Sequence, residues 1–357
     1  MTNADIRVGL IGYGFVGKTF HAAMITATPG MKLAAVASSR PESVLKDYPG
    51  IEVFSSPEDL IACHEIDLVV IATPNETHRP LAEAALRAGR NVLVDKPFML
   101  SLADTRAVIE TARQSGSLLS VFQNRRWDSD FRGVRSAIEA GRVGHVAVFE
   151  SHMGKFEPVP GDGWRDADVP GGGMWFDLAP HMADQALQLF GLPDSITADI
   201  AVLRPGGKAD DWFEVILSYP QHRVILRGSM MAAGGEARFT VHGSEGTLVK
   251  HGPDLQEDRL VAGIRPDAPG FGDDDDRMLF YGPDGAEAVT IPTPSGDQPE
   301  FYRRLEATLR GKRDNPVSAA QALAVMAVTE TAAEAARLGQ RLPLALTEKE
   351  RLAWRAG

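Results

Sequence analysis

The feature that most constrains the fold is a glycine-rich segment near the start of the chain. Gly12, Gly14 and Gly17 have G-x-G-x-x-G spacing, between the apolar run Ile6–Ile11 and a helical pattern over residues 15–27. The first glycine permits a tight turn, the second lets the backbone approach an anion, and the third lets the helix pack on the strand. Backbone amides and the helix dipole then face a phosphate. The segment predicts a dinucleotide site at a strand–helix turn, and a glycine-rich turn without a ligand is the alternative.

Strands and helices continue to alternate up to residue 124. Apolar runs over residues 32–38, 67–72, 91–94 and 118–122 predict strands. One predicted helix starts from a Thr77 cap and ends at Gly89. Another runs from Ser101, which forms a capping-box pattern with Asp104, to Gly116. Apolar strands that alternate with helices predict an α/β fold with a doubly wound parallel sheet, a Rossmann domain.

The pattern changes after residue 124. A helix is predicted over residues 130–140, and strands are predicted in hairpin-like succession over residues 213–219, 223–229 and 237–241. Further helices are predicted over residues 300–309 and 319–338. A chain of 357 residues is too long for one typical core. We therefore expect two domains: residues 1–124 as the dinucleotide-binding Rossmann domain, and residues 125–357 as an α+β substrate-binding and oligomerisation domain with an open, largely antiparallel sheet.

Composition excludes several classes of protein. Lysine and arginine number 37 against 48 aspartates and glutamates, a net charge of −11, which disfavours binding to nucleic acid or anionic membranes. No apolar run is long enough to cross a membrane, and the N-terminus lacks a secretory pattern. The single cysteine, Cys63, excludes an internal disulfide and a cysteine-based zinc cluster, so we expect a cytoplasmic protein. The aspartate run 273–276 is interpreted as a solvated loop rather than a metal site.

The residues after the second strand bear on the choice of cofactor. An NAD site usually has Asp or Glu here, because a carboxylate holds the ribose 2′-hydroxyl. This chain has Ser38, Ser39 and Arg40 instead. Two hydroxyls and a guanidinium suit a 2′-phosphate, so NADP is predicted, with NAD as the second choice. The alternative is that Arg40 is a solvated residue before Pro41.

A lysine follows the strand over residues 91–94, in the run Asp95-Lys96-Pro97. Ligands of open α/β sheets bind at the carboxyl ends of strands. Pro97 restricts Lys96 to an extended backbone and permits a cis bond. A lysine held there can polarise a substrate oxygen, and an ordinary surface lysine is the alternative.

Asp177 and His181 form a second candidate pair. At a spacing of four they share one face of a helix, where the carboxylate can orient the imidazole for proton transfer. Three interpretations compete: a metal pair, a helix-capping aspartate with an incidental histidine, and a catalytic couple. Metal binding is the weakest, because no further ligand follows at metal spacing. Capping and catalysis both remain open.

With these motifs in this order, the chain resembles the Gfo/Idh/MocA oxidoreductase family over essentially its whole length. Thr73-Pro74-Asn75-x-x-His78, Trp164-Arg165 and residues 241–248 also match the family pattern. Asp95 departs from it, since most members have glutamate there. The sequences of residues 12–21, 123–131 and 175–181 are most similar to those of the NADP-dependent scyllo-inositol dehydrogenase-like subgroup.

The resemblance implies hydride transfer between a nicotinamide and a cyclic polyol or sugar, with scyllo-inositol and scyllo-inosose as the best guess. It implies that His181 exchanges the proton of the reacting hydroxyl, Asp177 positions His181, and Lys96 binds the reacting oxygen. Three rivals remain: a dehydrogenase or reductase of an aldose or keto-sugar, a non-catalytic NADP(H) sensor, and an NAD-assisted glycosidase without net cofactor change.

The residue patterns and the resemblance together give the full set of candidate residues. Those expected to bind the cofactor are Gly12, Gly14, Phe15, Val16, Gly17, Ser38, Ser39, Arg40, Thr73, Pro74, Asn75, His78, Asp95, Lys96, Asn124, Trp164 and Arg165. Those expected to bind substrate are Lys96, Asn124, Arg126, Lys155, Trp164, Asp177 and His181. Structural roles are the alternative for some, with Arg126 paired to Asp128 or Asp130 and Trp164 in the core. An exposed sheet face with aromatic positions predicts a homodimer or homotetramer.

Overall fold

The computed structural model describes residues 4–285 and 287–356, and the chain divides into two compact units. The first comprises the residues through Asn124 together with Gln256–Phe271 and Gln298–Leu323, and the second comprises the rest. The division after Asn124 falls where the domain boundary was expected. Residues 256–271 and 298–323, however, lie in the first unit, whereas all of 125–357 was expected in the second domain. Packing explains the difference, because the ring of Phe122 contacts both Phe301 and Tyr302.

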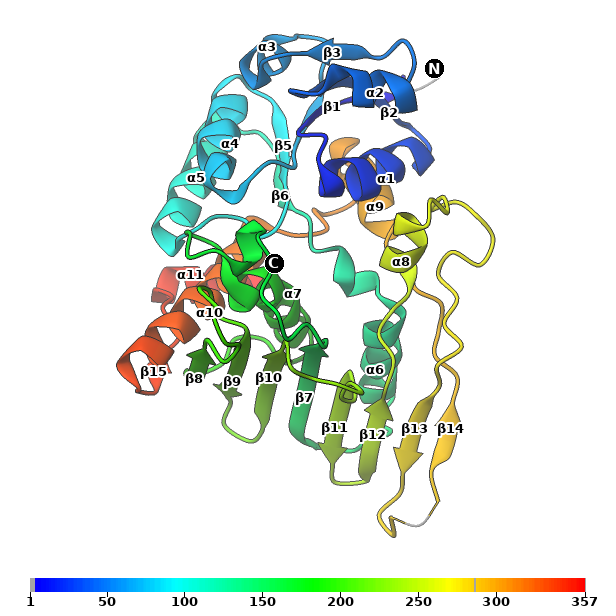
Figure 1. Cartoon of the computed structure of the whole chain (residues 1–357), viewed down its shortest axis with the longest axis vertical. Coiled ribbons are helices and arrows are strands. Elements are labelled where there is room, and N and C mark those ends of the chain that lie inside the picture. Colours follow the sequence, from blue (N-terminus) through cyan, green and yellow to red (C-terminus); the bar gives the residue numbers. More distant parts are fainter. Residues whose placement is uncertain (1–3, 286, 357) are drawn as a thin grey trace. The chain divides into compact units, whose positions relative to one another are not determined.

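The first unit contains a six-stranded sheet in the order β3-β2-β1-β4-β5-β6 (Figure 1). Every pairing in it is parallel, which confirms the Rossmann sheet. All four residues of the central strand β4 are buried, as expected for a sheet covered on both faces. The strands are β1 Ile6–Ile11, β2 Met31–Ala37, β3 Glu52–Phe54, β4 Leu68–Ile71, β5 Asn91–Val94 and β6 Leu119–Val121.

The helices of this unit begin and end with recognisable signals. Ser101 Oγ accepts a hydrogen bond from Asp104 N at 3.0 Å, as predicted, and Gly116 ends that helix in the left-handed region. Thr77 is the N-cap residue of its helix, as predicted, but its hydroxyl donates to the Pro74 carbonyl and does not accept from the helix. The helices are η1 Gly17–Ala22, α1 Ala23–Ala27, α2 Pro41–Asp47, α3 Pro57–Ala62, η2 Asn75–Thr77, α4 His78–Arg87, α5 Leu102–Ser115, α8 Gln256–Val261 and α9 Glu300–Leu309.

The second unit contains a nine-stranded mixed sheet in the order β14-β13-β12-β11-β7-β10-β9-β8-β15. Its pairings are antiparallel except for β10 with β7. The predicted hairpin of β9 with β10 is confirmed, but β10 and β11 are not neighbours, because β7 lies between them. The strands are β7 Val146–Gly154, β8 Ser195–Ala201, β9 Trp212–Ser218, β10 Arg223–Ser229, β11 Phe239–Gly243, β12 Gly246–Lys250, β13 Met278–Tyr281, β14 Val289–Ile291 and β15 Leu342–Pro343.

One face of this sheet is buried and the other is polar and partly exposed. Phe213 and Tyr219, the aromatic positions of the predicted strand, are buried. These two rings therefore do not form the exposed aromatic surface from which an oligomer was predicted. The open face carries the pair Arg227–Glu214 at 2.5 Å and half-buried Ile216 and Ile225.

Two helices of the second unit, η3 and α10, begin with residues that belong to the first unit. The helices are η3 Asn124–Trp127, α6 Ser129–Glu139, η4 Trp164–Asp166, α7 Gly173–Phe190, α10 Ala319–Leu338 and α11 Glu348–Ala356.

The aspartate run 273–276 is more buried than predicted. The Asp274 side chain is 1% exposed and lies 3.2 Å from the buried Lys250 ammonium, which also bonds Asp276 at 2.6 Å. The interpretation as a solvated loop is therefore wrong for Asp274, because a buried lysine needs carboxylate partners. None of the helices in the described part of the chain is both long and apolar enough to cross a membrane.

Candidate functional site

The predicted cofactor residues of the first unit lie in the turns that follow its parallel strands. Since β2, β1, β4, β5 and β6 are consecutive neighbours in the sheet, their carboxyl ends lie along one edge (Figure 1). A bound dinucleotide needs such a row of turns. The residues after each strand are Gly12–Gly17 after β1, Ser38–Arg40 after β2, Thr73–His78 after β4, Asp95 and Lys96 after β5, and Asn124 after β6.

The three glycines of the first turn differ in what surrounds them. Gly12 has a positive φ of 96°, and a Cβ there would overlap the Ala72 carbonyl. A Cβ on Gly17 would overlap the Gly12 carbonyl, so both positions are closed to larger residues. A Cβ on Gly14 would meet no atom within 4 Å. The middle glycine thus faces open space, as an approaching pyrophosphate requires, and the segment fits a dinucleotide.

The turn after β2 presents hydroxyls and a guanidinium. Ser38 Oγ accepts a hydrogen bond from Arg40 N at 3.1 Å, and the Arg40 side chain is exposed at the start of α2, where Pro41 takes the first helical position. No carboxylate occurs at residues 38–40. An exposed guanidinium at this strand end is available to a phosphate group.

The segment after β5 holds Lys96 against a buried carboxylate. The Lys96–Pro97 bond is cis, as the sequence permitted. Asp95 is 7% exposed, and its Oδ1 accepts a hydrogen bond from Lys96 N at 2.8 Å. Burial by itself raises the pKa of the Asp95 carboxyl, but the neighbouring His21 imidazole and Lys96 ammonium hold that pKa below its usual range. Asp95 is therefore an ionised group directly beside a half-buried lysine.

His78 links two of these turns. Its ring is buried, with Nδ1 3.0 Å from the Pro97 carbonyl and Nε2 3.0 Å from the Thr73 carbonyl. The ring contacts therefore join the turn after β4 to the turn after β5. His78 therefore links these two turns to each other, and its predicted contact with the cofactor stays a prediction.

In the second unit, Asp177 and His181 lie one turn apart on α7. The helix begins at Gly173, four residues before Asp177, so the interpretation of Asp177 as a helix cap is wrong. The N-cap residue is Gly172, and Asp210 accepts from the first turn of the helix: its Oδ1 from Trp175 N at 2.6 Å and its backbone carbonyl from Met174 N at 2.8 Å.

The Asp177 carboxylate is paired with a neighbouring arginine. Arg165 Nε lies 2.7 Å from Asp177 Oδ2, and the Arg165 guanidinium lies 5.1 Å from the Trp164 ring centroid. Trp164 is 46% exposed, so it is not part of the core. Among the described residues, no group of three or more His, Cys, Asp or Glu side chains is placed to hold a metal. The arrangement is a half-buried carboxylate one turn from a buried imidazole.

The remaining substrate candidates differ in burial and in the partners of their side chains. Arg126 makes two hydrogen bonds to Asp184, at 2.7 and 2.6 Å. Lys155 is half-exposed and pairs with Glu157 at 2.8 Å, and Asn124 is 4% exposed. The Arg126 charge is thus balanced by a buried carboxylate, and its predicted contact with the substrate stays a prediction.

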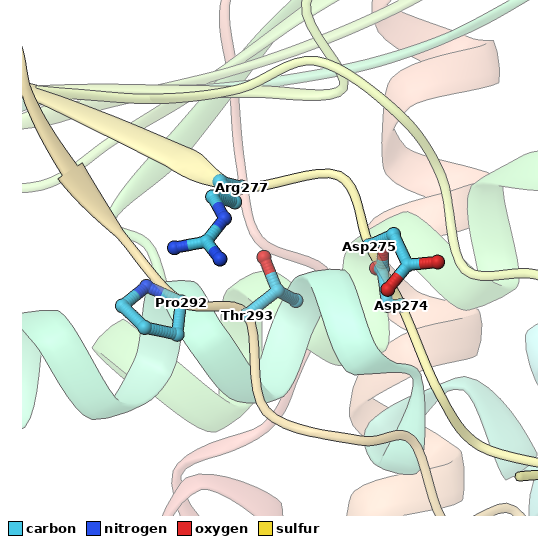
Figure 2. Close-up of a pocket in the computed structure, with 5 residues that line it drawn as sticks. All are labelled: Asp274, Asp275, Arg277, Pro292 and Thr293. Carbon is cyan, nitrogen blue, oxygen red and sulfur yellow. The ribbon is translucent and has the colours of Figure 1, made fainter.

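A hollow of about 310 Å³ in the second unit contains none of the candidate residues. Asp274, Asp275, Arg277, Pro292 and Thr293 line it. In Figure 2 the Arg277 guanidinium extends toward Pro292, and the two carboxylates lie at the other end. We assign no role to it.

Replacing Asp210 by asparagine is expected to change how stability depends on pH. Burial raises the pKa of the Asp210 carboxyl from 3.8 to about 6. The folded state therefore holds this proton more tightly, and the stability this provides is present below pH 3.8 and lost as the pH rises through about 6. The unfolding free energy of Asp210→Asn minus that of wild type should therefore rise by about 2 kcal/mol between pH 4 and pH 8. Urea titrations at several pH values measure it. Asp199→Asn, at an exposed aspartate, should show no such trend; a parallel pH dependence of Asp210→Asn and wild type would contradict the assignment.

Comparison with known proteins agrees with this geometry. Residues 6–123 match the family model described as oxidoreductase family, NAD-binding Rossmann fold, and residues 135–346 match its C-terminal alpha/beta domain. The chain belongs to the Gfo/Idh/MocA family of oxidoreductases. It is therefore an oxidoreductase with an NAD-binding Rossmann domain, as the motifs predicted.

Individual relatives in the family cover nearly the whole chain. An uncharacterized oxidoreductase of Escherichia coli, YdgJ, is 48% identical over 96% of this chain and 99% of its own length. The NADP-dependent scyllo-inositol 2-dehydrogenase IolW of Bacillus subtilis is 30% identical over 93% and 94%. A crystal structure of a putative oxidoreductase from Klebsiella pneumoniae has a TM-score of 0.94 at 48% identity, over 99% of both chains.

Three polar residues that contact the motif segments were not predicted. His21 was noted only as part of a similar run, and Tyr302 and Asp210 were not noted at all. His21 stands four residues after the last glycine of the motif, which is the one signal for it in the sequence. Tyr302 and Asp210 reach their positions through long-range packing, for which the sequence gives no local pattern.

Proposed function

We propose that this oxidoreductase is an NADP-dependent dehydrogenase acting on the CH–OH group of a cyclic polyol, with scyllo-inositol as substrate. The observation that carries the proposal is the match over 93% of the chain to a relative named as an NADP-dependent scyllo-inositol 2-dehydrogenase. An inositol 2-dehydrogenase of Rhizobium meliloti, 35% identical over 68% of the chain, supports the same substrate class.

The proposal gives each candidate residue a task. The nicotinamide, when bound, supplies the hydride chemistry. Lys96 donates a hydrogen bond to the reacting oxygen from the end of β5, and His181 exchanges the hydroxyl proton. Asp177, whose carboxylate lies against Arg165, binds a neighbouring hydroxyl and helps to orient the imidazole one turn along α7.

The main rival is the same chemistry on another sugar. It is favoured by a relative named 1,5-anhydro-D-fructose reductase, from Ensifer adhaerens, 30% identical over 68% of the chain. A spectrophotometric screen of NADP reduction against inositols, pentoses and hexoses, with NADPH oxidation against the ketones, separates the two. Turnover of aldoses or keto-sugars alone would move the assignment to the rival. No redox turnover would favour a sensor, and glycoside cleavage without net NADPH change would favour a hydrolase.

Arg40 is expected to determine the preference for NADP. A charge-assisted contact to the 2′-phosphate contributes about 1.5–3 kcal/mol of binding free energy. A loss of about 1.4 kcal/mol weakens binding tenfold. Arg40→Ala should therefore lower the ratio of kcat/KM for NADP over NAD by at least about tenfold. Lys46→Ala, which removes an exposed charge from the other end of α2, is the matched control and should leave the ratio near that of wild type. A wild-type enzyme that prefers NAD would refute the choice of cofactor.

We also propose that the enzyme forms a homodimer or homotetramer through the open face of the nine-stranded sheet. Half-buried Ile216 and Ile225 pair with each other across β9 and β10, and Val148 lies on the adjacent strand β7. A small apolar strip surrounded by charges is typical of the centre of a subunit interface. Light scattering of wild type and Ile225→Glu tests this, and a monomeric wild type would contradict it.

A further inference from the structure

Arg204 is a buried arginine that none of the proposed chemical steps uses. It follows β8, in the loop over residues 202–211 of the second unit, and is 5% exposed. Its Nε lies 3.0 Å from Asp211 Oδ2, and Asp211 is fully buried. A buried arginine is stable only when its charge and its N–H groups are paired. The partners of Arg204 therefore show which segments it joins.

The other partners of Arg204 lie in a different loop, over residues 155–172. Its Nη2 donates a hydrogen bond to the Asp166 carboxylate, and its Nη1 donates to the Glu157 carbonyl at 3.2 Å. Glu157 lies near the start of that loop and Asp166 near its end. Residues 161–165, between them, are exposed. One buried guanidinium thus fixes both parts of a segment whose middle lies at the surface.

The loop that carries Arg204 is itself anchored to the start of α7. The Asp211 carboxylate accepts from the backbone N–H of Arg204 at 3.0 Å as well as from its guanidinium. The neighbouring Asp210 accepts from two backbone N–H groups in the first turn of α7. The support of Arg204 is therefore continuous with the helix on which Asp177 lies.

The loop over residues 155–172 also returns to this helix. The residue before Asp166 is Arg165, whose Nε lies 2.7 Å from Asp177 Oδ2. The backbones approach closely as well, because a Cβ on Gly172, the N-cap of α7, would lie 2.5 Å from the Ala167 carbonyl. The contacts therefore form a closed ring that starts and ends on α7, with the buried guanidinium at its centre.

We propose that Arg204 is a positioning residue, which fixes the loop over residues 155–172 so that Arg165 stays against Asp177. The inference rests on the proposed function, in which Asp177 binds a substrate hydroxyl. An arginine suits the task because its planar guanidinium presents several donors in fixed directions, here to two carboxylates and one carbonyl. Without this anchor Arg165 leaves its partner, which alters binding of the substrate more than proton exchange at His181.

Hydrogen–deuterium exchange tests the anchoring without substrate. Backbone amides over residues 166–172 are bonded within the loop, so their exchange reports how often it opens. Asp166→Ala removes the loop end of the contact and keeps the buried Arg204–Asp211 pair. Exchange of the peptides over residues 155–172 should become at least about tenfold faster, since a charge-assisted hydrogen bond is lost. Asp166→Glu, which keeps the charge, should restore much of the protection.

A matched control lies in the same loop. Asp168→Ala removes an exposed carboxylate two residues further along and should leave exchange near that of wild type. Arg204→Gln removes the other end of the contact and should accelerate exchange in the same peptides. Because it also leaves Asp211 without its guanidinium, Asp166→Ala decides the outcome if Arg204→Gln does not fold.

Steady-state kinetics with the polyol found by the screen tests the link to Asp177. Asp166→Ala should raise KM for the polyol by about tenfold and lower kcat by less than about threefold. Arg165→Ala should have the same effect. The double variant should be no worse than Arg165→Ala alone, because both changes act through one contact. A residue that only supports the fold would give additive losses.

Two results overturn the positioning role: wild-type exchange over residues 155–172 in Asp166→Ala, and additive kinetic losses in the double variant. If Asp177→Asn keeps wild-type KM and kcat, the task proposed for Asp177 fails, and the positioning role that rests on it fails too. If Asp177 is required but exchange and KM in Asp166→Ala match wild type, the positioning role alone fails and the proposed function stands.

Discussion

Lys96→Ala and His181→Ala are each expected to lower kcat by at least about 10²-fold while binding of NADPH persists. Proton exchange by a positioned side chain contributes about 10²–10⁴-fold, and neither alanine can supply it. The glycine-rich turn lies outside both substitutions, so cofactor affinity should change little. Steady-state kinetics with the substrate found by the screen, and NADPH fluorescence titration, measure the two quantities.

Matched controls separate this effect from a general loss of charge. Lys312→Ala and His145→Ala remove exposed side chains and should keep kcat within about twofold of wild type. Turnover near the wild-type level in Lys96→Ala or in His181→Ala would refute the role proposed for that residue. A loss of NADPH binding in step with kcat would point instead to damage of the cofactor domain.

The parts of the fold that could be predicted are those specified by local pattern. The period of the apolar residues located β5 and β10 to the residue, and the glycine spacing located the first turn of the sheet. The placement of Asp177 and His181 one turn apart on one helix followed from a spacing of four. In each case the information lies within one strand, one turn or one helix, where backbone geometry alone determines which residues share a face.

What could not be predicted depends on contacts between distant segments. The return of residues 256–271 and 298–323 to the first unit depends on packing such as that of Phe301 against Phe122, which leaves no periodic signal. The strand order of the nine-stranded sheet could not be predicted for the same reason. In it β7 lies between β10 and β11, although β7 precedes both by many residues in the sequence. The contact of Arg126 with Asp184 was not predicted, because the two residues lie 58 positions apart in the sequence.

Breaking the Arg126–Asp184 pair is expected to have the largest effect on stability. The two side chains are 8% and 2% exposed and are joined by two hydrogen bonds. Removing one partner leaves the other charge buried and uncompensated, which costs about 3–5 kcal/mol. Arg126→Met should therefore lower the free energy of unfolding by that amount, as should Asp184→Leu. Urea denaturation at neutral pH measures both.

The double variant Arg126→Met with Asp184→Leu distinguishes a structural pair from a substrate contact. Because both charges leave together, it should recover most of the stability lost in either single variant. If the pair only supports the fold, the double variant should also recover kcat/KM. Full stability with persistently low kcat/KM would instead return Arg126 to the substrate site. Arg135→Met, at an exposed pair with Glu139, is the control and should cost no more than about 0.5 kcal/mol.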